Sequence, residues 1–166
     1  MSSQTAIPFS APTTAASGNS SQLISIFCDG ACSGNPGAGG WACIVEQDGE
    51  RREYSGGAAH TTNNQMELQA LIEGLKNVPQ DGNLRIVTDS EYLVKGVTQW
   101  MKGWIANGWK TAARQPVKNQ AHWEKINDLL AGRTYKFEWV KGHSGHEENE
   151  RCDDLARAEI VKLKSR

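Results

Sequence analysis

The sequence predicts an α/β domain with a mixed five-stranded sheet and the element order βββαβααβα. Three observations lead to this fold class. The apolar runs 23–28 and 84–88 read as buried strands, and each is followed at once by an aspartate, Asp29 or Asp89. A hairpin signal, Asp48-Gly49, lies between two further strand-like segments. Stretches with helical spacing of apolar residues separate the later strands.

The first half of the chain predicts three strands in meander order followed by a helix. Strands are expected at 23–29, 41–45 and 51–55, with residues 30–40, rich in glycine, as a tight connection. The segment Thr62-Asn63-Asn64-Gln65 has the form of a capping box that opens a helix. Apolar residues then recur at helical spacing, at Leu68, Leu71, Ile72 and Leu75. A turn at 79–83 ends this helix before the strand 84–89.

The second half predicts three helices and one strand. A helix is expected from 92 to about 107, in which Gly96 and Gly103 mark breaks or close packing. A basic loop at 108–118 leads to a helix at 120–130, where Trp123 belongs to the apolar face. A strand at 135–140 and a last helix from about 149 complete the domain.

Composition favours one globular domain, preceded by a flexible N-terminal tail over residues 1–22. The chain has 166 residues and 38% hydrophobic residues, enough for a core. The tail is uncharged and has neither the basic start nor the apolar middle of a secretory signal. No apolar stretch approaches the ~20 residues of a membrane span. We therefore expect a cytoplasmic protein that does not enter membranes, with residues 23–166 as its functional domain.

Charge is distributed unevenly along the chain. The formal net charge is −1, yet residues 92–123 contain no acid and hold five basic residues and four tryptophans. This window is suited to nucleic acid, while the remaining chain is acidic.

The two strand-ending aspartates indicate a metal-dependent enzyme. A carboxylate at the end of a buried strand is costly to desolvate and needs a cation or a hydrogen-bond partner. Neighbouring strands would place Asp29 and Asp89 at one sheet edge, where open α/β folds have their sites. Clustered carboxylates favour Mg²⁺ or Mn²⁺ over zinc. Two such ions can activate water and stabilise the leaving oxygen in phosphodiester cleavage.

Two further acids, Glu67 and Asp153, join this set only if the fold brings them to the same edge. Each is expected near the start of a helix, where the helix dipole alone would explain an acid. Asp154 lies off the apolar stripe and is expected in solvent. A zinc site from His143, His146 and Cys152 is the weaker alternative, because no Cys-x-x-Cys pair supports it. His143, in a loop with glycines on both sides, is better suited to moving a proton or releasing product.

Four motifs in this order resemble those of type 1 ribonuclease H, in the bacterial form with a basic protrusion. They are 29–37 (DGACSGNPG), 61–68 (TTNNQMEL), 88–90 (TDS) and 139–156 (WVKGHSGHEENERCDDLA). The resemblance covers about residues 23–161. It implies a ribonuclease H-like fold and an endonuclease that cuts the RNA strand of RNA–DNA hybrids, leaving 3′-hydroxyl and 5′-phosphate ends. It also implies a monomer that uses two Mg²⁺ ions, or Mn²⁺, with substrate bound.

The resemblance assigns roles to individual positions. It implies that Asp29, Glu67, Asp89 and Asp153 are metal-binding catalytic acids, with His143 as a mobile loop histidine and Glu150 as an auxiliary acid. The implied RNA-strand contacts are Asn35, Asn63 and Asn64. The implied DNA-strand contacts are a phosphate pocket of Thr62 and Asn119 and a channel of Tyr92, Trp100 and Trp104. The basic protrusion keeps Lys102, Lys110, Arg114 and Lys118.

The chain departs from the family pattern in two places. His60 stands where the family often has an arginine of the phosphate pocket. Ile105-Ala106-Asn107 stands where well-known bacterial relatives have adjacent basic residues. Because each lost phosphate contact lowers the salt slope by about 0.9 for duplex DNA, we predict weaker and less salt-sensitive hybrid binding than in those relatives.

Two other functions remain as alternatives. One is another metal nuclease of the same fold, such as a resolvase, an integrase-like domain or a domain cut from a reverse transcriptase; cleavage of duplex DNA with the hybrid left intact would favour it. A non-catalytic nucleic-acid binding module would leave the four acids unexplained, since without metal they would repel phosphate.

Overall fold

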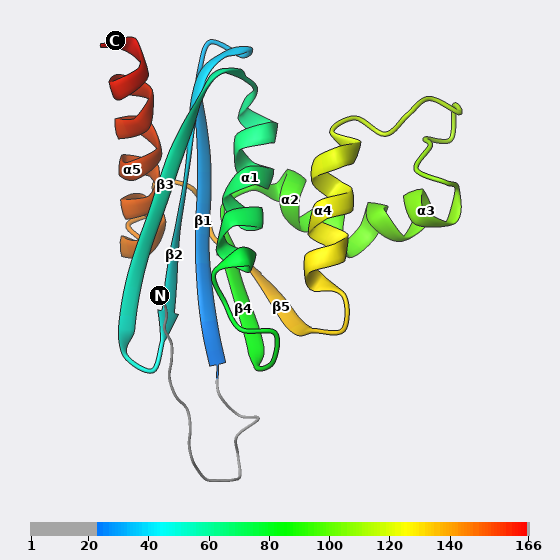
Figure 1. Cartoon of the computed structure of the whole chain (residues 1–166), viewed down its shortest axis with the longest axis horizontal. Coiled ribbons are helices and arrows are strands. Elements are labelled where there is room, and N and C mark those ends of the chain that lie inside the picture. Colours follow the sequence, from blue (N-terminus) through cyan, green and yellow to red (C-terminus); the bar gives the residue numbers. More distant parts are fainter. Residues whose placement is uncertain (1–22, 166) are drawn as a thin grey trace, which may run out of the picture.

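A central strand, β1 (Leu23–Ser33), organises the sheet of this protein. The structure is a computed structural model that describes residues 23–165 (Figure 1). The sheet has five strands in the order β3-β2-β1-β4-β5. Residues 24–30 are all buried because helices cover both faces of β1. A strand without a solvent-facing side reads as a continuous apolar run, which explains the pattern in the sequence. The predicted tail, residues 1–22, lies outside the described residues.

Strands β2 (Gly37–Gln47) and β3 (Glu50–Thr61) form the predicted hairpin. Its turn residues Asp48 and Gly49 have φ values of 54° and 78°, as a type I′ turn requires. The expected connection at 30–40 was wrong in extent, because β1 and β2 run through most of it and are antiparallel. The glycines there serve packing: a Cβ on Gly40 would collide with the Ala156 carbonyl oxygen of α5.

Strands β4 (Asn83–Thr88) and β5 (Thr134–Trp139) extend the sheet on the other side of β1, and all three are parallel. Cys28 of β1 is paired with Thr88, the last residue of β4. The residues that follow, Asp29 and Asp89, therefore meet at one edge of the sheet. The pairing register therefore brings together two aspartates that lie 60 residues apart in the sequence.

Helix α1 (Asn63–Lys76) connects β3 to β4 and packs on the sheet. The Oγ1 atom of Thr62 accepts a hydrogen bond from the Gln65 backbone N–H at 3.1 Å, so the predicted N-cap is confirmed. The Gln65 side chain does not complete a capping box, because its Oε1 accepts from the Thr61 hydroxyl instead. Since the helix begins at Asn63, Glu67 lies beyond its first turn.

The helices form a layer on each face of the sheet. Helices α1 and α4 (Gln120–Leu130) lie on one face and contact each other, and α5 (Glu147–Lys164) lies on the opposite face over β1, β2 and β3 (Figure 1). The larger apolar core lies on the α1 side and includes the fully buried Trp123. A smaller cluster around Phe27, Cys152 and Ala156 lies beneath α5.

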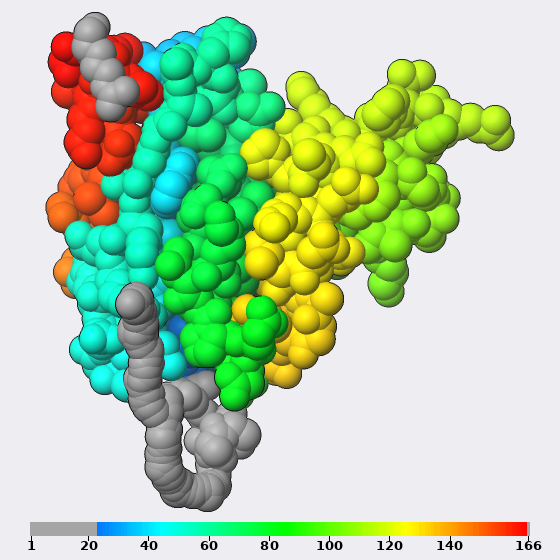
Figure 2. All heavy atoms as spheres, viewed as in Figure 1, coloured from blue at the N-terminus to red at the C-terminus, as the bar shows by residue number. Residues whose placement is uncertain are grey.

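The helix expected at 92–107 is divided into three parts. These are α2 (Glu91–Lys95), a π-helical turn η3 (Gly96–Trp100) and α3 (Met101–Ala106). Gly96 begins the π turn and packs directly against the Trp123 ring, as predicted. Gly103 neither breaks the helix nor packs closely, so that prediction was wrong. The lime-green segment around α3 and the following loop projects from the body of the molecule (Figure 2).

Candidate active site

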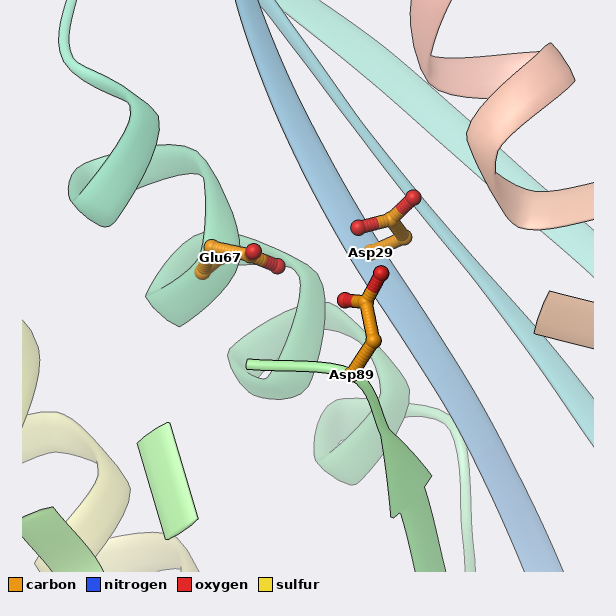
Figure 3. A group of neighbouring side chains, drawn as sticks. All are labelled: Asp29, Glu67 and Asp89. Carbon is orange, nitrogen blue, oxygen red and sulfur yellow. The ribbon is translucent and has the colours of Figure 1, made fainter. Parts of the chain in front are cut away.

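Three carboxylates from three different elements converge at the edge where β1 and β4 meet. Asp29 comes from β1, Asp89 follows β4, and Glu67 reaches over from α1 (Figure 3). One oxygen of each lies within 4.8 Å of the others. Among residues 23–165, this is the one group of three or more acidic, histidine or cysteine ligand atoms that converges in this way. Three of the four predicted acids thus share a site.

The backbone of Gly30 holds two of these acids in place. Its N–H donates to Asp29 Oδ1 and to Glu67 Oε1, both at 2.9 Å. This shared donor compensates only part of the cost of burying two carboxylates. The sequence carries a faint signal for it, a glycine directly after the strand-ending aspartate, but the pattern alone did not predict this role for Gly30.

Burial and mutual repulsion disfavour the negative charges of Asp29 and Glu67. Burial and the neighbouring Asp89 carboxylate raise the pKa of Asp29 from 3.8 to about 8. Burial and the Asp29 carboxylate raise the pKa of Glu67 well above its usual range. Both shifts mean that the negative charges of these side chains are poorly compensated by the protein itself. A bound cation would supply the missing compensation.

Contacts with the last residue of β5 and with the loop that follows it fix the position of Asp89. The indole Nε1 of Trp139 donates to the Asp89 carbonyl oxygen at 3.0 Å. Gly142 lies against the carboxylate, and a Cβ there would be 2.8 Å from Asp89 Oδ2. The sequence did not predict either contact, because nothing local shows that this loop folds over the end of β4.

Asp153 lies close enough to Asp29 to raise its pKa but is not part of the converging group. Its Oδ2 lies 2.8 Å from Nη2 of Arg157 on the same helix. Helix α5 begins at Glu147, so Asp153, like Glu67, lies beyond the first turn. The helix-dipole explanation for these two acids was therefore wrong, since the dipole acts within the first turn. Asp154 is exposed, as predicted.

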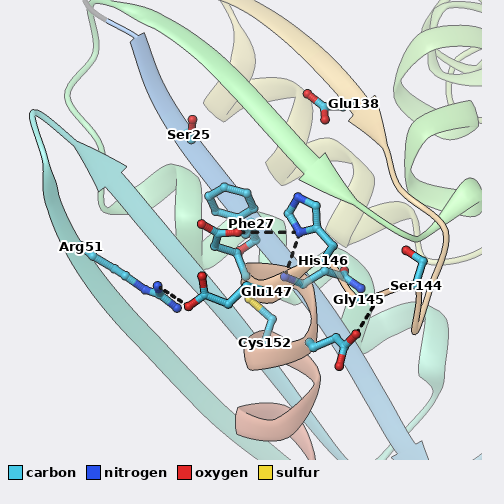
Figure 4. A network of polar contacts seen from close by, with 12 residues as sticks. Ser25, Phe27, Arg51, Glu138, Ser144, Gly145, His146, Glu147 and Cys152 are labelled. Atoms are coloured by element: carbon cyan, nitrogen blue, oxygen red, sulfur yellow. Dashed lines mark hydrogen bonds and ion pairs between the residues drawn. The ribbon is translucent and has the colours of Figure 1, made fainter.

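The loop that carries His143 is fastened to the start of α5 (Figure 4). His143 itself is exposed and has φ 55°. His146 is the N-cap of α5, since its Nδ1 accepts from the Asn149 N–H at 3.3 Å. Glu150 Oε2 accepts from the Gly145 N–H at 2.7 Å. His146 and Glu150 therefore define the start of the helix beside the exposed position of His143.

The zinc alternative lacks support among the described residues. Cys152 is fully buried on the face of α5 that packs on the sheet, and its Sγ lies 3.5 Å from the Phe27 carbonyl oxygen. Burial raises the pKa of its thiol, which disfavours the thiolate that zinc requires. It does not converge with His143 and His146 into a ligand group.

The three asparagines assigned to the RNA strand lie around the N-terminus of α1. Asn35 and Asn64 are exposed, and Asn63 is half-buried. Asn35 Oδ1 accepts from the Asn63 backbone N–H at 3.0 Å. The turn after β1 and the start of α1 therefore form one polar surface beside the acids.

The residues assigned to the DNA strand lie at the N-cap of α1 (Thr62), on α2, η3 and α3, and at the N-cap of α4 (Asn119). The rings of Tyr92 and Trp100 are 5.9 Å apart, as are those of Trp100 and Trp104. Trp104 also packs on buried Trp123, and Trp109 is half-buried against the same core. Trp100 remains 37% exposed. The four basic residues of the protrusion are all exposed: Lys102, Lys110, Arg114 and Lys118.

Comparison with known proteins decides the family. A family model described as RNase H matches residues 21–161. The chain belongs to the ribonuclease H family. It is 46% identical to a ribonuclease H of Pelobacter propionicus over 151 residues, covering 91% of this chain and 93% of that one. It is 50% identical to ribonuclease HI of Neisseria meningitidis over 135 residues, covering 81% and 93%.

Solved structures agree with this ribonuclease H assignment. LC9-RNase H1, a type 1 enzyme, superposes with a TM-score of 0.77 at 30% identity, covering 86% of this chain and 74% of that one. LC11-RNase H1, solved with an RNA/DNA hybrid, superposes with a TM-score of 0.64 at 26% identity, covering 84% and 97%. The predicted family, fold class and enzyme class, a phosphodiester hydrolase, are confirmed. No helix within residues 23–165 is long and apolar enough to cross a membrane.

Proposed function

We propose that this ribonuclease H hydrolyses the RNA strand of RNA–DNA hybrids with metal-ion assistance and leaves 3′-hydroxyl and 5′-phosphate ends. The observation that carries the proposal is the convergence of Asp29, Glu67 and Asp89 in a chain of this family. A hybrid bound to the similar LC11-RNase H1 supports the choice of substrate. The four cysteines are free, in keeping with a cytoplasmic location, and we expect a monomer.

The acidic site fits a hard divalent cation. Its donors are carboxylate oxygens, which suit Mg²⁺ or Mn²⁺ better than zinc. The raised pKa values of Asp29 and Glu67 reflect negative charge that a cation would neutralise. We propose two Mg²⁺ ions with substrate bound. When bound, the ions lower the pKa of a water and stabilise the oxygens that attack and leave.

The residues around the three carboxylates would orient the groups that hold the cations and the substrate. The Gly30 N–H fixes the Asp29 and Glu67 carboxylates, and Trp139 fixes the end of β4 that carries Asp89. Asp153, whose carboxylate contacts Arg157, would be a fourth carboxylate available to hold a cation next to Asp29. His143 accepts or donates a proton as product leaves, from an exposed loop position that permits movement. Glu150 assists as an auxiliary acid next to this loop.

Substrate binding uses two polar surfaces, one aromatic channel and the basic protrusion. Asn35, Asn63 and Asn64 contact the RNA strand, where the 2′-hydroxyl distinguishes RNA from DNA. Thr62 and Asn119 hold a phosphate of the DNA strand. The rings of Tyr92, Trp100 and Trp104 line the channel for that strand, and the basic protrusion, Lys102, Lys110, Arg114 and Lys118, contacts its phosphates.

Substrate choice and product ends test this function. The purified protein with Mg²⁺ is incubated with end-labelled hybrid, duplex DNA, duplex RNA and single strands of one sequence. Cleavage confined to the RNA strand of the hybrid, with fragments that carry 3′-hydroxyl and 5′-phosphate ends, is the expected result. Cutting of duplex DNA would instead support another metal nuclease of the same fold.

A further inference from the structure

A chain of side-chain hydrogen bonds runs beneath the surface assigned to the DNA strand. The Thr61 hydroxyl donates to Gln65 Oε1 at 2.8 Å, and Gln65 Nε2 donates to Asn119 Oδ1 at 3.3 Å. Asn119 Nδ2 then donates to the Tyr92 hydroxyl at 3.1 Å, which also accepts from Trp123 Nε1 at 3.2 Å. The chain thus joins the end of β3, α1, the start of α4 and α2.

Both ends of this chain are anchored in buried residues. Thr61 is 5% exposed and Trp123 is fully buried, whereas Gln65, Asn119 and Tyr92 between them are half-buried. Gln65, Asn119 and Tyr92 are therefore held at the surface by a chain of hydrogen bonds that ends in buried residues. A side chain held by two oriented hydrogen bonds loses less freedom when it binds a ligand.

The backbone at Asn119 fits a role in binding rather than in capping. Asn119 precedes α4 with φ 63°, a left-handed conformation that asparagine tolerates. It makes no side-chain capping bond to α4, although asparagine is a favoured N-cap residue. Its amide is instead held by Gln65 and Tyr92: Oδ1 accepts from Gln65 Nε2, and Nδ2 donates to the Tyr92 hydroxyl. One amide N–H remains available to a phosphate oxygen.

We propose that Gln65 and the Tyr92 hydroxyl are positioning residues that orient the Asn119 amide toward a DNA-strand phosphate. This inference rests on the proposed function of the Thr62 and Asn119 pocket and adds two residues that act through Asn119. The Tyr92 hydroxyl bonds to Asn119, and the Tyr92 ring lines the aromatic channel. The same hydrogen-bond network therefore positions both the phosphate pocket and the channel. Loss of Gln65 is thus expected to weaken binding without changing the chemical step.

The test compares Gln65→Leu with Gln69→Leu. Gln69 lies one turn later on α1, is half-buried, and its side chain bonds to Glu73 on its own helix, so Gln69→Leu is the matched control. We expect Gln65→Leu to raise KM for the hybrid about fivefold to tenfold and to leave kcat within twofold. The salt slope of hybrid binding should stay unchanged, because neither Gln65 nor Asn119 carries a charge that displaces counterions. Gln69→Leu should change neither KM nor kcat.

A double-mutant cycle with Asn119→Ala separates positioning from general stability. If Gln65 acts through Asn119, the double variant Gln65→Leu/Asn119→Ala has the KM of Asn119→Ala alone. Tyr92→Phe, which keeps the ring and removes the hydroxyl, should behave like Gln65→Leu in the same cycle. Additive effects, or equal KM values for Gln65→Leu and Gln69→Leu, would overturn the proposal.

The same data distinguish a failure of this inference from a failure of the proposed function. If wild type cuts the hybrid and Asn119→Ala raises KM while Gln65→Leu does not, only the positioning role is refuted. If wild type cuts the hybrid and Asn119→Ala leaves KM unchanged, the phosphate pocket and the positioning role are both refuted. Absence of hybrid cleavage by wild type would refute the proposed function itself.

Discussion

Single residues around the three carboxylates decide how the acidic site is built. Asp29 and Glu67 share one backbone donor, and Asp89 is fixed by contacts from Trp139 at the end of β5 and from Gly142 in the following loop. These contacts hold the carboxylate oxygens close together, although their negative charges repel one another. The residue scale therefore offers the sharpest tests of both the repulsion and the geometry.

The first prediction concerns the stability of Asp29→Asn in EDTA. The folded-state pKa of Asp29 is about 8, above its ordinary value of 3.8, so folding favours the protonated form. Its contribution to stability is fully present below about pH 4 and is lost as pH rises through 8. Asp29→Asn should be more stable than wild type at pH 8 by at least ~1 kcal/mol, because one pKa unit is worth about 1.36 kcal/mol.

Thermal unfolding followed by circular dichroism from pH 5 to pH 8 measures this difference. The advantage of Asp29→Asn should shrink toward pH 5. Added Mg²⁺ should stabilise wild type, by ~2.7 kcal/mol at one hundred times its Kd, and should stabilise the variant much less. Equal stability of the two proteins at pH 8 in EDTA would contradict the repulsion described here.

The second prediction is that Gly142→Ala impairs catalysis without unfolding the protein. A Cβ at this position would lie 2.8 Å from Asp89 Oδ2, so the carboxylate or the loop must move. Misplacement of a catalytic group by ~1 Å can lower the rate about a hundredfold. We expect a loss of that order in kcat, measured with the hybrid, and a near-unchanged circular dichroism spectrum. Wild-type turnover would show that the loop yields freely.

The third prediction is that His143→Ala slows turnover without abolishing it. Its loop position is exposed and lies outside the acidic group, so it acts on proton transfer or product release rather than on metal binding. A positioned proton-transfer group contributes about 10²-fold or more, and we expect a loss near the lower end. Steady-state kcat with the hybrid measures it. An inactive variant would require a more central role for His143.

At the scale of elements, local patterns predicted the strands and helices well where one element carries its own signal. The run before Asp29 is continuous because β1 is covered on both sides, whereas β4 keeps the half-buried Arg85 within its run. The hairpin signal at Asp48-Gly49 and the cap at Thr62 are likewise local, and both are confirmed. The boundaries at 30–40 were misjudged because most glycines there lie within strands at close approaches, such as Gly30 against α1 and Gly40 against α5, and only Gly34 lies in the turn.

Contacts between distant elements could not be predicted from the sequence. The Gly30 N–H and the Glu67 carboxylate are 37 residues apart, and Gln65 and Asn119 are 54 apart. No periodicity links such pairs, since they depend on how α1 and α4 pack against the sheet. The expected place of Glu67 in the first helical turn was wrong although the cap at Thr62 was predicted, because Glu67 is the fifth residue of a helix that begins at Asn63.

The fourth prediction concerns the basic protrusion, the projecting segment that carries Lys102, Lys110, Arg114 and Lys118. Because all four side chains are exposed, each is free to meet a phosphate. Replacing Lys110 or Arg114 by glutamine should reduce the slope of log K against log salt concentration for hybrid binding. The expected reduction is about 0.9 per residue, the value for a phosphate contact with duplex DNA. Lys125→Gln, an exposed change on α4, is the control. Unchanged slopes for both protrusion variants would exclude them from binding.

The whole molecule combines a rigid acidic site with a projecting basic segment. The sheet and its two helical layers place the carboxylates at one edge, and the protrusion extends from the α2–α4 side (Figures 1 and 2). The net charge of −1 therefore conceals two surfaces of opposite sign. Such a separation suits a polyanionic substrate, since one surface attracts phosphates while the other binds them only with cations present.

The measurement that tests the central claim most directly is hybrid cleavage by wild type and by Asp29→Asn, each with Mg²⁺ and with EDTA. The asparagine side chain keeps the volume of aspartate and removes its charge. We predict that wild type with Mg²⁺ cuts the RNA strand and that the other three samples do not, while circular dichroism shows both proteins folded. Near-normal turnover of Asp29→Asn, or cleavage by wild type in EDTA, would contradict a metal site built on Asp29.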